Sequence, residues 1–598
     1  MRKIFIIFSL CLANTIQSQD TYKFRLLLTD KEGSEYSVER PEEFLSERAL
    51  ARRAKYAIPI DITDLPVSKT YLNLLLQQPG ITLVNQSKWM NSVVISCNDS
   101  LSGVHLKNLP FVDSVKVVWK RKAGSRSEDA GQKHVITNVV VQSAKTNPNN
   151  KHGTGQWIAS FLAMTGAQHG WIPQVSPRLE TRGSVTETLS FSGIMAVDNA
   201  ANVDSGNDDD YYGRADNQIK LHNGDWLHGA GYKGAGIMIA VIDAGFKNAN
   251  NIQGLNQSII GDKDFVMPGG NVYAGDMSNH GTMVLATMAA NIPGTMVGTA
   301  PEATYWLLRS EDISSEYPVE EDYWAAAAEF ADSVGVDVMN TSLGYSDFDF
   351  PAMSYTKNQL DGKTAFISQA SHIAAQKGIL ACVSAGNSGA GAWRLINFPG
   401  DAENVLTVGS VNKDGVIAPS SSVGPTADQR IKPNLTAMGV SACVLNESGD
   451  VAFSSGTSFA SPIMAGLGAC LLQAFPNYSN TDIIRLLEKS ASQSDMPDYD
   501  YGYGIADVYK AYLTGKSSVE RMSDKTPVLF VSPFGMLSVC NLPGSTEKYT
   551  VTVHNACGEL LCKKIPAGGS IDVSSLQQGV YLVTVQGGGV VHSCKIVK

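Results

Sequence analysis

Between residues 211 and 515 the chain alternates apolar runs of strand length with amphipathic helical patterns, and this alternation constrains the fold more than any other feature. Three runs are continuously apolar and lack the alternation of apolar and polar residues that a half-exposed strand shows: 236–242, 336–340 and 379–384. Helical patterns lie between them at 320–334 and at 361–377, where Asp361 is expected to cap the helix. Strands that are apolar on both sides and are joined through helices predict an α/β domain, with a parallel sheet covered by helices on both faces.

The flanking regions have other patterns. Residues 20–122 follow the order β-α-β-β-α-β of a small α+β unit, and the charged stretch 40–55 within it is expected to be a surface helix. Residues 123–210 show no steady hydrophobic period and are left as an unassigned insertion or linker. Residues 516–525 are polar and predict a linker. Residues 526–598 contain short strands with turn signals, which predicts a small all-β, β-sandwich-like module.

The first 18 residues predict export. Arg2 and Lys3 precede an apolar run at 4–13, and small and polar residues follow up to Ser18, which is typical of a signal peptide. Of the eight cysteines outside this segment, four lie in the last part of the chain, and their density suggests two disulfides formed in an oxidising compartment. Cys382 and Cys470 lie in apolar runs and are expected to be buried thiols.

Charge and composition exclude several classes of protein. The chain has 47 Lys and Arg against 57 Asp and Glu, a formal net charge of −10, and no basic block, which argues against a nucleic-acid partner. With 43% hydrophobic and 17% charged residues, the chain has the composition of a globular protein and not of a disordered one.

Three polar residues stand at the ends of predicted elements. Asp243 directly follows an apolar strand, His280 opens a helix, and Ser458 precedes an apolar helix that continues to Phe475. A serine hydroxyl becomes a good nucleophile when an imidazole takes its proton, and the imidazole needs a carboxylate to orient it. Because sites in parallel α/β sheets lie at the carboxyl ends of the strands, these three side chains are predicted to meet within hydrogen-bonding reach.

A fourth residue fits the same chemistry. Asn387, after the strand at 379–384, is expected to donate its amide to an oxyanion together with the backbone N–H of Ser458. Each residue alone has a structural explanation: the aspartate can end a strand, the asparagine can form a turn, and His228, also followed by glycine, competes with His280. The four together, and the segment Gly-Thr-Ser-Phe-Ala-Ser-Pro at 456–462, favour catalysis. Pro462 is expected in the first turn of its helix.

With these motifs the region 211–515 resembles the subtilisin-like serine proteases. The chain order Asp, His, Ser agrees with that family and excludes the Ser, Asp, His order of the α/β-hydrolases. The resemblance implies an edge segment that pairs with the substrate backbone and further residues that bind the substrate beside the cleaved bond: Ser342, Leu343, Gly344, Ala385, Gly386 and Asn397. Asn397, at the pocket floor for the residue before that bond, is uncharged, so the resemblance gives no reason to expect lysine or arginine there.

The resemblance also gives meaning to the flanks. Residues 20–122 are similar to the inhibitory prodomain of these proteases, and 120–122 (Lys-Arg-Lys) is a candidate processing site or a solvated basic turn. Residues 526–598 resemble the sorting domains of Bacteroidetes type IX secretion, at 569–576 and 578–582, but lack the usual Pro-Asn-Pro opening. This implies a protein that is secreted or held in the envelope of a Gram-negative bacterium, with secretion machinery as a partner.

The sequence therefore predicts a secreted serine endopeptidase that acts on proteins or peptides and is inhibited by its own prodomain. No cofactor is expected. Structural calcium is common in the family, but no ligand loop can be read, so metal ligands stay unknown. Two alternatives stay open: a catalytically silent surface adhesin or binding module on the same fold, and a hydrolase of esters or lactones.

Overall fold

The computed structural model describes residues 20–121, 142–143, 211–275 and 277–523, and about two-thirds of the C-terminal module in short ranges: 528–531, 536–540, 549–555, 557–564, 570–577, 579–587 and 590–597. The predicted signal peptide at 1–18 and nearly all of the unassigned stretch 123–210 lie outside the described residues.

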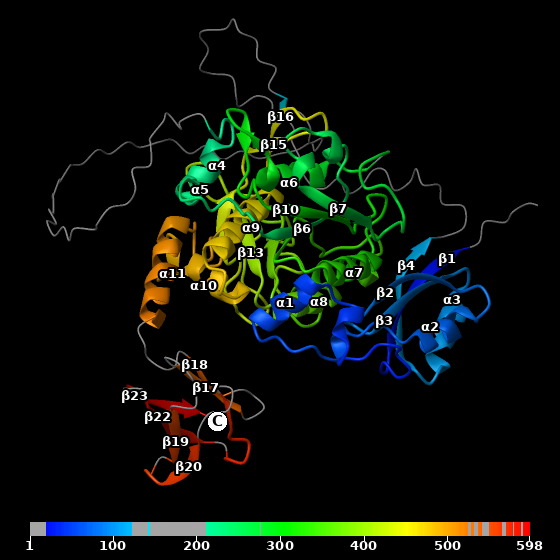
Figure 1. Ribbon diagram of the computed structural model, residues 1–598. Helices are drawn as coiled ribbons and strands as arrows, with labels where there is room; N and C mark the ends of the chain where they lie inside the picture. Colours follow the sequence, from blue (N-terminus) through cyan, green and yellow to red (C-terminus); the bar gives the residue numbers. More distant parts are fainter. Residues whose placement is uncertain are drawn as a thin grey trace, which may run out of the picture. The chain divides into compact units, whose positions relative to one another are not determined.

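Seven parallel strands form the central sheet, in the order β14-β13-β12-β11-β6-β10-β7 (Figure 1). They are β6 (Met238–Asp243), β7 (Ile259–Asp264), β10 (Thr304–Arg309), β11 (Val338–Thr341), β12 (Leu380–Ser384), β13 (Leu406–Val411) and β14 (Leu435–Met438). In β6, Ile239 and Val241 pack into one hydrophobic cluster, whereas Ala240 and Ile242 pack into another on the opposite face. Burial on both faces explains the apolar runs, and the predicted parallel α/β fold is confirmed.

Helices cover both faces of this sheet. On one side lie α6 (His280–Ala289), α9 (Thr457–Ala474), α10 (Asn480–Ser490) and α11 (Val508–Ser523), and on the other α7 (Val319–Val334) and α8 (Phe366–Gln376). Short elements complete the domain: α4 (Asp216–Lys220), α5 (Gly224–Gly229), β8 (Asn291–Ile292), β9 (Met296–Val297), β15 (Ala442–Leu445) and β16 (Val451–Ser454).

Two predicted boundaries are wrong. α8 begins at Phe366 and not at Asp361, because the Asp361 carboxylate accepts from the backbone N–H groups of Lys363 and Thr364 and closes a turn before the helix. α11 extends to Ser523, so most of the stretch predicted as a linker at 516–525 is helical. Its lysine, glutamate and arginine residues are good helix formers, which a reading based on polarity alone overlooks.

Among the described residues, one helix, α9, has the length and apolar composition that a membrane span would need. Of its apolar window, 89% is buried inside the protein, as in the core helix of a globular domain.

The N-terminal unit has the predicted β-α-β-β-α-β order. Its antiparallel sheet runs β2-β3-β1-β4, and its elements are β1 (Thr21–Leu28), α2 (Lys69–Leu76), β2 (Thr82–Ser87), β3 (Ser92–Cys97), α3 (Ser100–His105) and β4 (Val112–Arg121). Trp89, Val94 and Val118 of this unit join the same hydrophobic cluster as α7 and α8. The unit is therefore docked on the helical face opposite α6 and α9.

The charged stretch at 40–55 contains helix α1 (Glu47–Lys55), which lies at the surface as predicted, but two of its arginines are buried. Arg53 is 2% exposed and donates to the carboxylates of Asp64 and Asp332, at 2.9 Å each. Arg52 is also buried and donates to Asp332. This face of the helix is buried because it packs on the C-terminal end of α7, where Asp332 supplies the counter-charge.

Other contacts fix the unit to α7. The guanidinium of Arg25, on β1, donates to both carboxylate oxygens of Asp322 at 2.6 Å. Glu329, two turns further along α7, accepts from the backbone N–H groups of Lys88 and Trp89 at 2.8 and 3.0 Å. These contacts and the α1 cluster place buried ionic or charge-assisted bonds along the whole length of α7.

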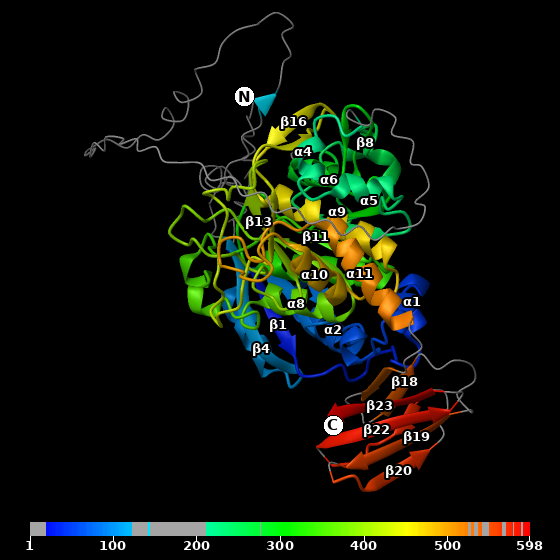
Figure 2. The same cartoon turned by 90° about the vertical axis from the view of Figure 1, so that its left-hand side faces the viewer.

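The C-terminal module is all-β, as predicted. One antiparallel sheet contains β17 (Val528–Val531), β18 (Met536–Cys540) and β21 (Ser570–Asp572). A second runs β20-β19-β22-β23 (Figure 2), with β19 (Tyr549–Asn555), β20 (Leu560–Lys564), β22 (Val580–Gly587) and β23 (Val590–Val597). Cys557 and Cys562 are free thiols, so the two disulfides suggested by the cysteine density do not both form.

Candidate active site

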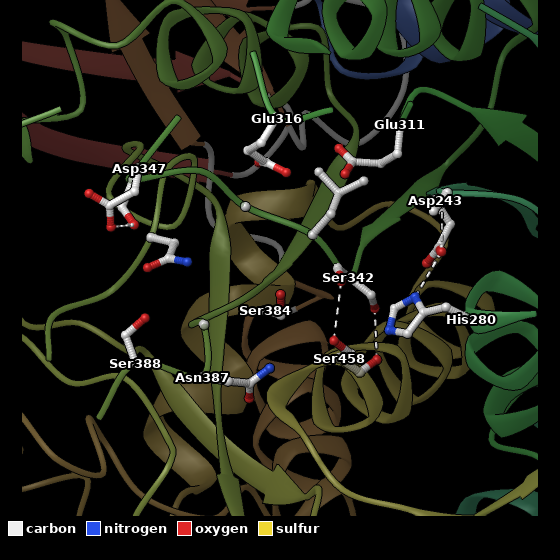
Figure 3. A pocket seen from close by; sticks show the side chains of 16 residues that line it. Asp243, His280, Glu311, Glu316, Ser342, Asp347, Ser384, Asn387, Ser388 and Ser458 are labelled. Atoms are coloured by element: carbon white, nitrogen blue, oxygen red, sulfur yellow. Dashed lines mark hydrogen bonds and ion pairs between the residues drawn. The ribbon is translucent and has the colours of Figure 1, made fainter. Parts of the chain in front are cut away.

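The carboxyl ends of the central strands and the starts of two helices meet around one cavity of about 320 Å³ (Figure 3). Asp243 is the last residue of β6, and His280 is the first residue of α6. Ser458 is the second residue of α9, and Asn387 follows β12. All four residues line this cavity, although they are far apart in the sequence.

Asp243 and His280 form a buried, hydrogen-bonded pair. The Oδ1 of Asp243 lies 2.8 Å from the Nδ1 of His280 and also accepts from the backbone N–H of Ala244. The exposed fractions are 1% for Asp243 and 4% for His280. Burial alone would lower the pKa of His280, but the charge and hydrogen bond of Asp243 raise that pKa above the ordinary histidine value. The Nε2 of His280 has no hydrogen-bond partner, so it can accept a proton.

Ser458 is joined to Ser342 by two reciprocal hydrogen bonds. The Oγ of Ser458 donates to the carbonyl of Ser342 at 3.2 Å, and the Oγ of Ser342 donates to the carbonyl of Ser458 at 2.7 Å. The predicted contact between the Ser458 hydroxyl and His280 is thus not formed in this structure. His280 is nevertheless adjacent, because its ring centroid lies 5.8 Å from that of Phe459.

Pro462 explains why the carbonyl of Ser458 is available to Ser342. In an α-helix the N–H of residue 462 would donate to the carbonyl of residue 458, and proline has no N–H. Pro462 is the sixth residue of α9, not a first-turn residue as predicted, because the helix already begins at Thr457. The Ser342 hydroxyl therefore takes the place of a missing helical donor.

Asn387 is held by the residue that precedes Ser458. Its Oδ1 accepts from the backbone N–H and from the hydroxyl of Thr457, at 2.9 and 3.2 Å. With the oxygen occupied in this way, the Nδ2 donors are left for the cavity, and Figure 3 shows the side chain directed toward Ser458. Gly386 has φ +103°, and a Cβ there would come within 2.9 Å of the Asn397 side chain, so this turn requires glycine.

Five of the six predicted substrate-binding residues line the cavity: Ser342, Leu343, Gly344, Gly386 and Asn397. Ala385 does not line it. Its side chain is fully buried, and its carbonyl accepts from the N–H of Asn397 at 2.9 Å, so Ala385 supports the pocket wall from behind.

Three carboxylates in the cavity were missed by the sequence analysis: Glu311, Glu316 and Asp347. Glu311 lies two residues beyond β10, where a search of strand ends would have found it. Glu316 and Asp347 lie in irregular loops, and no motif marks them. The cavity is therefore more acidic than the uncharged Asn397 suggested.

His228, the competing histidine, is a structural residue. Its Nδ1 pairs with the hydroxyl of Tyr212 and its Nε2 with the carbonyl of Thr299, both at 3.0 Å. Burial lowers its pKa to about 4, so the ring is neutral, and both of its nitrogens already have hydrogen-bond partners. Cys382 and Cys470 are fully buried free thiols, as predicted.

No group of three or more His, Cys, Asp or Glu side chains suited to a metal ion occurs in the part of the chain that the structure describes. The chemical groups gathered in the cavity are the buried imidazole–carboxylate pair of His280 and Asp243, the hydroxyl of Ser458 and the amide of Asn387.

Comparison with protein families gives two matches. The model described as the subtilase family matches residues 234–504, which contain all four of these side chains. The model described as the peptidase S8 propeptide domain of Bacteroidota matches residues 23–134, which include all but the first residues of the docked α+β unit.

Individual relatives are similar to about half of this chain. Subtilisin DY of Bacillus licheniformis is 30% identical over 298 residues, which are 49% of this chain and 97% of the relative. Subtilisin E of Bacillus subtilis is 30% identical over 48% of this chain and 68% of its own length. Among solved structures, MycP1 from Mycobacterium smegmatis is 22% identical over a match that covers 52% of this chain and 86% of that one, with a TM-score of 0.40.

Proposed function

The chain belongs to the subtilase family and is a serine-type endopeptidase with its own propeptide domain, and we propose that it cleaves peptide bonds by acyl transfer through Ser458. The observation that carries this proposal is the hydrogen-bonded pair of Asp243 and His280, buried in one cavity with Ser458. A free imidazole Nε2 beside a serine hydroxyl is the arrangement that nucleophilic catalysis needs.

The first step begins with a rotation of the Ser458 side chain. Its hydroxyl leaves the carbonyl of Ser342 and donates to the Nε2 of His280 instead. His280 takes the proton as Oγ forms a bond to the peptide carbonyl carbon, and Asp243 stabilises the imidazolium. The carbonyl oxygen becomes an oxyanion, which accepts from the Nδ2 of Asn387 and from the backbone N–H of Ser458. That N–H lies in the first turn of α9 and has no helical acceptor.

The second step releases the products. His280 gives its proton to the departing amine, and the C–N bond breaks to leave an acyl group on Ser458. Water then loses a proton to His280 and attacks the ester, and the serine hydroxyl is restored. All groups in this scheme belong to the chain, so we expect no cofactor, and hydrolysis should continue after dialysis against EDTA.

The propeptide and the cavity support two further parts of the proposal. Substrates are proteins or peptides, and the docked propeptide is an intramolecular inhibitor. We infer that the substrate backbone lies along Ser342, Leu343 and Gly344 as an added strand. The side chain before the cleaved bond then faces Asn397.

We also propose that the protein acts outside the cytoplasm of a Gram-negative bacterium. The basic and apolar start at 1–18 and the Bacteroidota-type propeptide support this, and the all-β C-terminal module fits a sorting role in secretion. Mass spectrometry of the protein from culture medium and from membranes tests it. Intact 1–18 in a cytoplasmic fraction would contradict the localisation.

A fluorophosphonate probe tests the catalytic proposal directly, because it bonds to an activated serine. We expect labelling of the processed wild-type chain at Ser458 and none of the Ser458→Ala variant. A chain that is processed, folded and yet unlabelled would instead be the silent adhesin or binding module. Matched peptide and ester substrates separate a peptidase from an esterase.

A further inference from the structure

The carboxylates of Glu311 and Glu316 line the catalytic cavity without a cation of their own. In the part of the chain that the structure describes, no lysine or arginine forms an ion pair with either, nor with Asp347. Glu311 accepts a hydrogen bond from the hydroxyl of Tyr345, and Asp347 accepts one from the hydroxyl of Ser346. Three acidic groups thus lie in one cavity, and among the described residues no lysine or arginine neutralises them; His280 is the one titratable base that lines the cavity with them.

This cavity binds a ligand on independent grounds. His280, which is 4% exposed, directs an unpartnered Nε2 into it, and the Oδ2 of Asp243 is also buried without a partner. An unsatisfied, buried catalytic pair identifies the cavity as the place where a substrate completes the hydrogen bonding. The acidic groups therefore lie where substrate side chains pass.

The two glutamates are held in place by the loop that carries them. Glu316 exchanges backbone hydrogen bonds with Asp349: its carbonyl accepts from the N–H of Asp349 at 2.9 Å, and its N–H donates to the Asp349 carboxylate at 3.0 Å. Glu320, at the start of α7, accepts from the N–H groups of Asp312 and Tyr317 and closes the loop between them. These hydrogen bonds hold the loop in one conformation, so Glu311 and Glu316 have fixed positions in the cavity wall.

Glu311 and Glu316 lie on one side of the segment that carries Ser342, and Asn387 lies on the other (Figure 3). We use P1 for the substrate residue whose carbonyl is attacked, and P2, P3 and P4 for the residues before it. Under the proposed function the P1 side chain faces Asn397. Because side chains of an extended peptide alternate between faces, those of P2 and P4 face the two glutamates.

The propeptide already places a cation beside this loop. The Nζ of Lys120, near the end of β4, lies 3.2 Å from the ring centroid of Phe350, the residue that follows Asp349. Lys120 forms no ion pair with the cavity carboxylates in the described residues, so a cation is tolerated beside this loop while the carboxylates stay available to a cation from another chain.

Electrostatics agree with the geometry. Burial raises the pKa of Glu311 to about 7, and the charge of Asp243 acts in the same direction. Burial and the charge of Glu311 also raise the pKa of Glu316. The carboxylates repel one another and hold protons that a bound guanidinium or ammonium group would displace.

We propose that Glu311 and Glu316 form an acidic subsite that selects substrates with arginine or lysine at P2 or P4. The inference rests on the proposed function and adds the substrate class. It needs no charge at P1, where the wall contains Asn397.

The test compares arginine with citrulline, which has the same shape but no charge. A library of fluorogenic tetrapeptides, varied in turn at P1 to P4, is hydrolysed by the processed wild-type protein, with active sites counted by fluorophosphonate labelling. We expect kcat/KM for arginine to exceed that for citrulline about tenfold or more at P2 or P4, and the ratio to fall at high salt. Ratios near one at both positions, or a preference confined to P1, would overturn the subsite while hydrolysis and labelling uphold the proposed function.

Variants locate the effect. Glu316→Gln is expected to lower the arginine-to-citrulline ratio about tenfold. Asp414→Asn removes one charge from an exposed residue outside the cavity and should leave the ratio unchanged. Equal falls in both variants, or no fall in Glu316→Gln, would contradict the assignment. Absence of labelling and of all hydrolysis would overturn the proposed function and the subsite together.

Discussion

Ser342 and Ser458 hold each other by two hydrogen bonds, one from each hydroxyl to the carbonyl of the other residue. This pair connects the end of β11, where the substrate is proposed to lie, to the first turn of α9. Pro462 makes the connection necessary, because it leaves the carbonyl of Ser458 without its helical donor.

We therefore predict that Ser342→Ala destabilises the protein and that Pro462→Ala partly reverses the loss. An unpaired buried carbonyl costs about 1–3 kcal/mol, which corresponds to a fall in Tm of roughly 2–10 °C. In the double variant the new N–H at 462 can donate to the carbonyl of Ser458. Recovery is partial, because the Asn340 amide also loses its acceptor on Ser342. Thermal unfolding in a Ser458→Ala background avoids autolysis. A double variant no more stable than Ser342→Ala would refute this explanation.

Removal of the nucleophile is expected to abolish turnover. Ser458→Ala should lower kcat about 10⁶-fold, a size taken from subtilisin and not calculated for this chain. The measurement is hydrolysis of a fluorogenic peptide by the processed protein. Ser461→Ala is a matched control, because Ser461 lies one turn away and its hydroxyl donates to Asn340, not into the cavity. Turnover by Ser458→Ala at the wild-type rate would disprove the assignment.

Asn387→Ala should lower kcat far more than it changes KM. The amide is proposed to bind the oxyanion, which exists in the transition state and not in the bound substrate. A loss of about 10²–10³-fold is expected, again by analogy with subtilisin. Because Asn387 also accepts from Thr457, Asn387→Asp keeps an acceptor there but has no donor. Both variants should lose kcat; recovery in Asn387→Asp would mean that the residue has a structural role.

The rate should rise with pH as His280 loses its proton, because only the neutral imidazole can act as a base. Asp243 raises the pKa of His280, so the inflection should lie above the ordinary value of about 6.5. Asp243→Asn should shift it to lower pH and lower the plateau about 10⁴-fold.

A second group titrates in the same range. Burial raises the pKa of Glu311 to about 7, and Glu311 faces the same cavity. Glu311→Gln has no titratable group at this position, so the inflection in its pH profile of kcat/KM reports the pKa of His280 without a contribution from residue 311. An inflection in that variant which does not move on adding Asp243→Asn would contradict the pairing.

Buried ionic contacts should keep the propeptide bound after cleavage. Arg53→Met leaves Asp64 and Asp332 short of a counter-charge, and the dissociation constant of the cleaved propeptide should rise about a hundredfold. Lys69→Met removes an exposed ion pair with Glu35 and should have almost no effect. Gel filtration of the processed protein measures how much propeptide stays attached. Equal retention in both variants would argue against the α1 cluster as an anchor.

The sequence predicted the fold well where patterning is local. The central strands are predicted correctly because both of their faces are buried, and the order of the propeptide elements follows from short strand-like runs and from a helix with leucines on one side. The predicted boundaries of α8 and α11 are wrong, because turn chemistry at Asp361 and helix propensity at 516–523 outweigh the pattern of polar residues.

Contacts across the chain were harder to predict. Arg52 and Arg53 look like surface residues, and only the distant Asp332 shows why they are buried. Glu316 likewise carries no local signal, because it reaches the cavity through its backbone pairing with Asp349. Asp243, His280 and Ser458 could be selected as candidates because each lies at or near an element end, whereas the resting position of the Ser458 hydroxyl depends on Ser342 and Pro462 together.

The docking of the propeptide on α7 has a consequence for the working life of the enzyme. Asp322, Glu329 and Asp332 are buried acids on one helix of the catalytic domain. Their partners are Arg25, the backbone at 88–89, Arg52 and Arg53, and all of these belong to the propeptide, which we propose is removed on maturation. A mature molecule that unfolds must bring these repelling charges together again without that help. We expect denaturation of the mature protein to be irreversible, so that its half-life depends on its unfolding rate and not on its equilibrium stability.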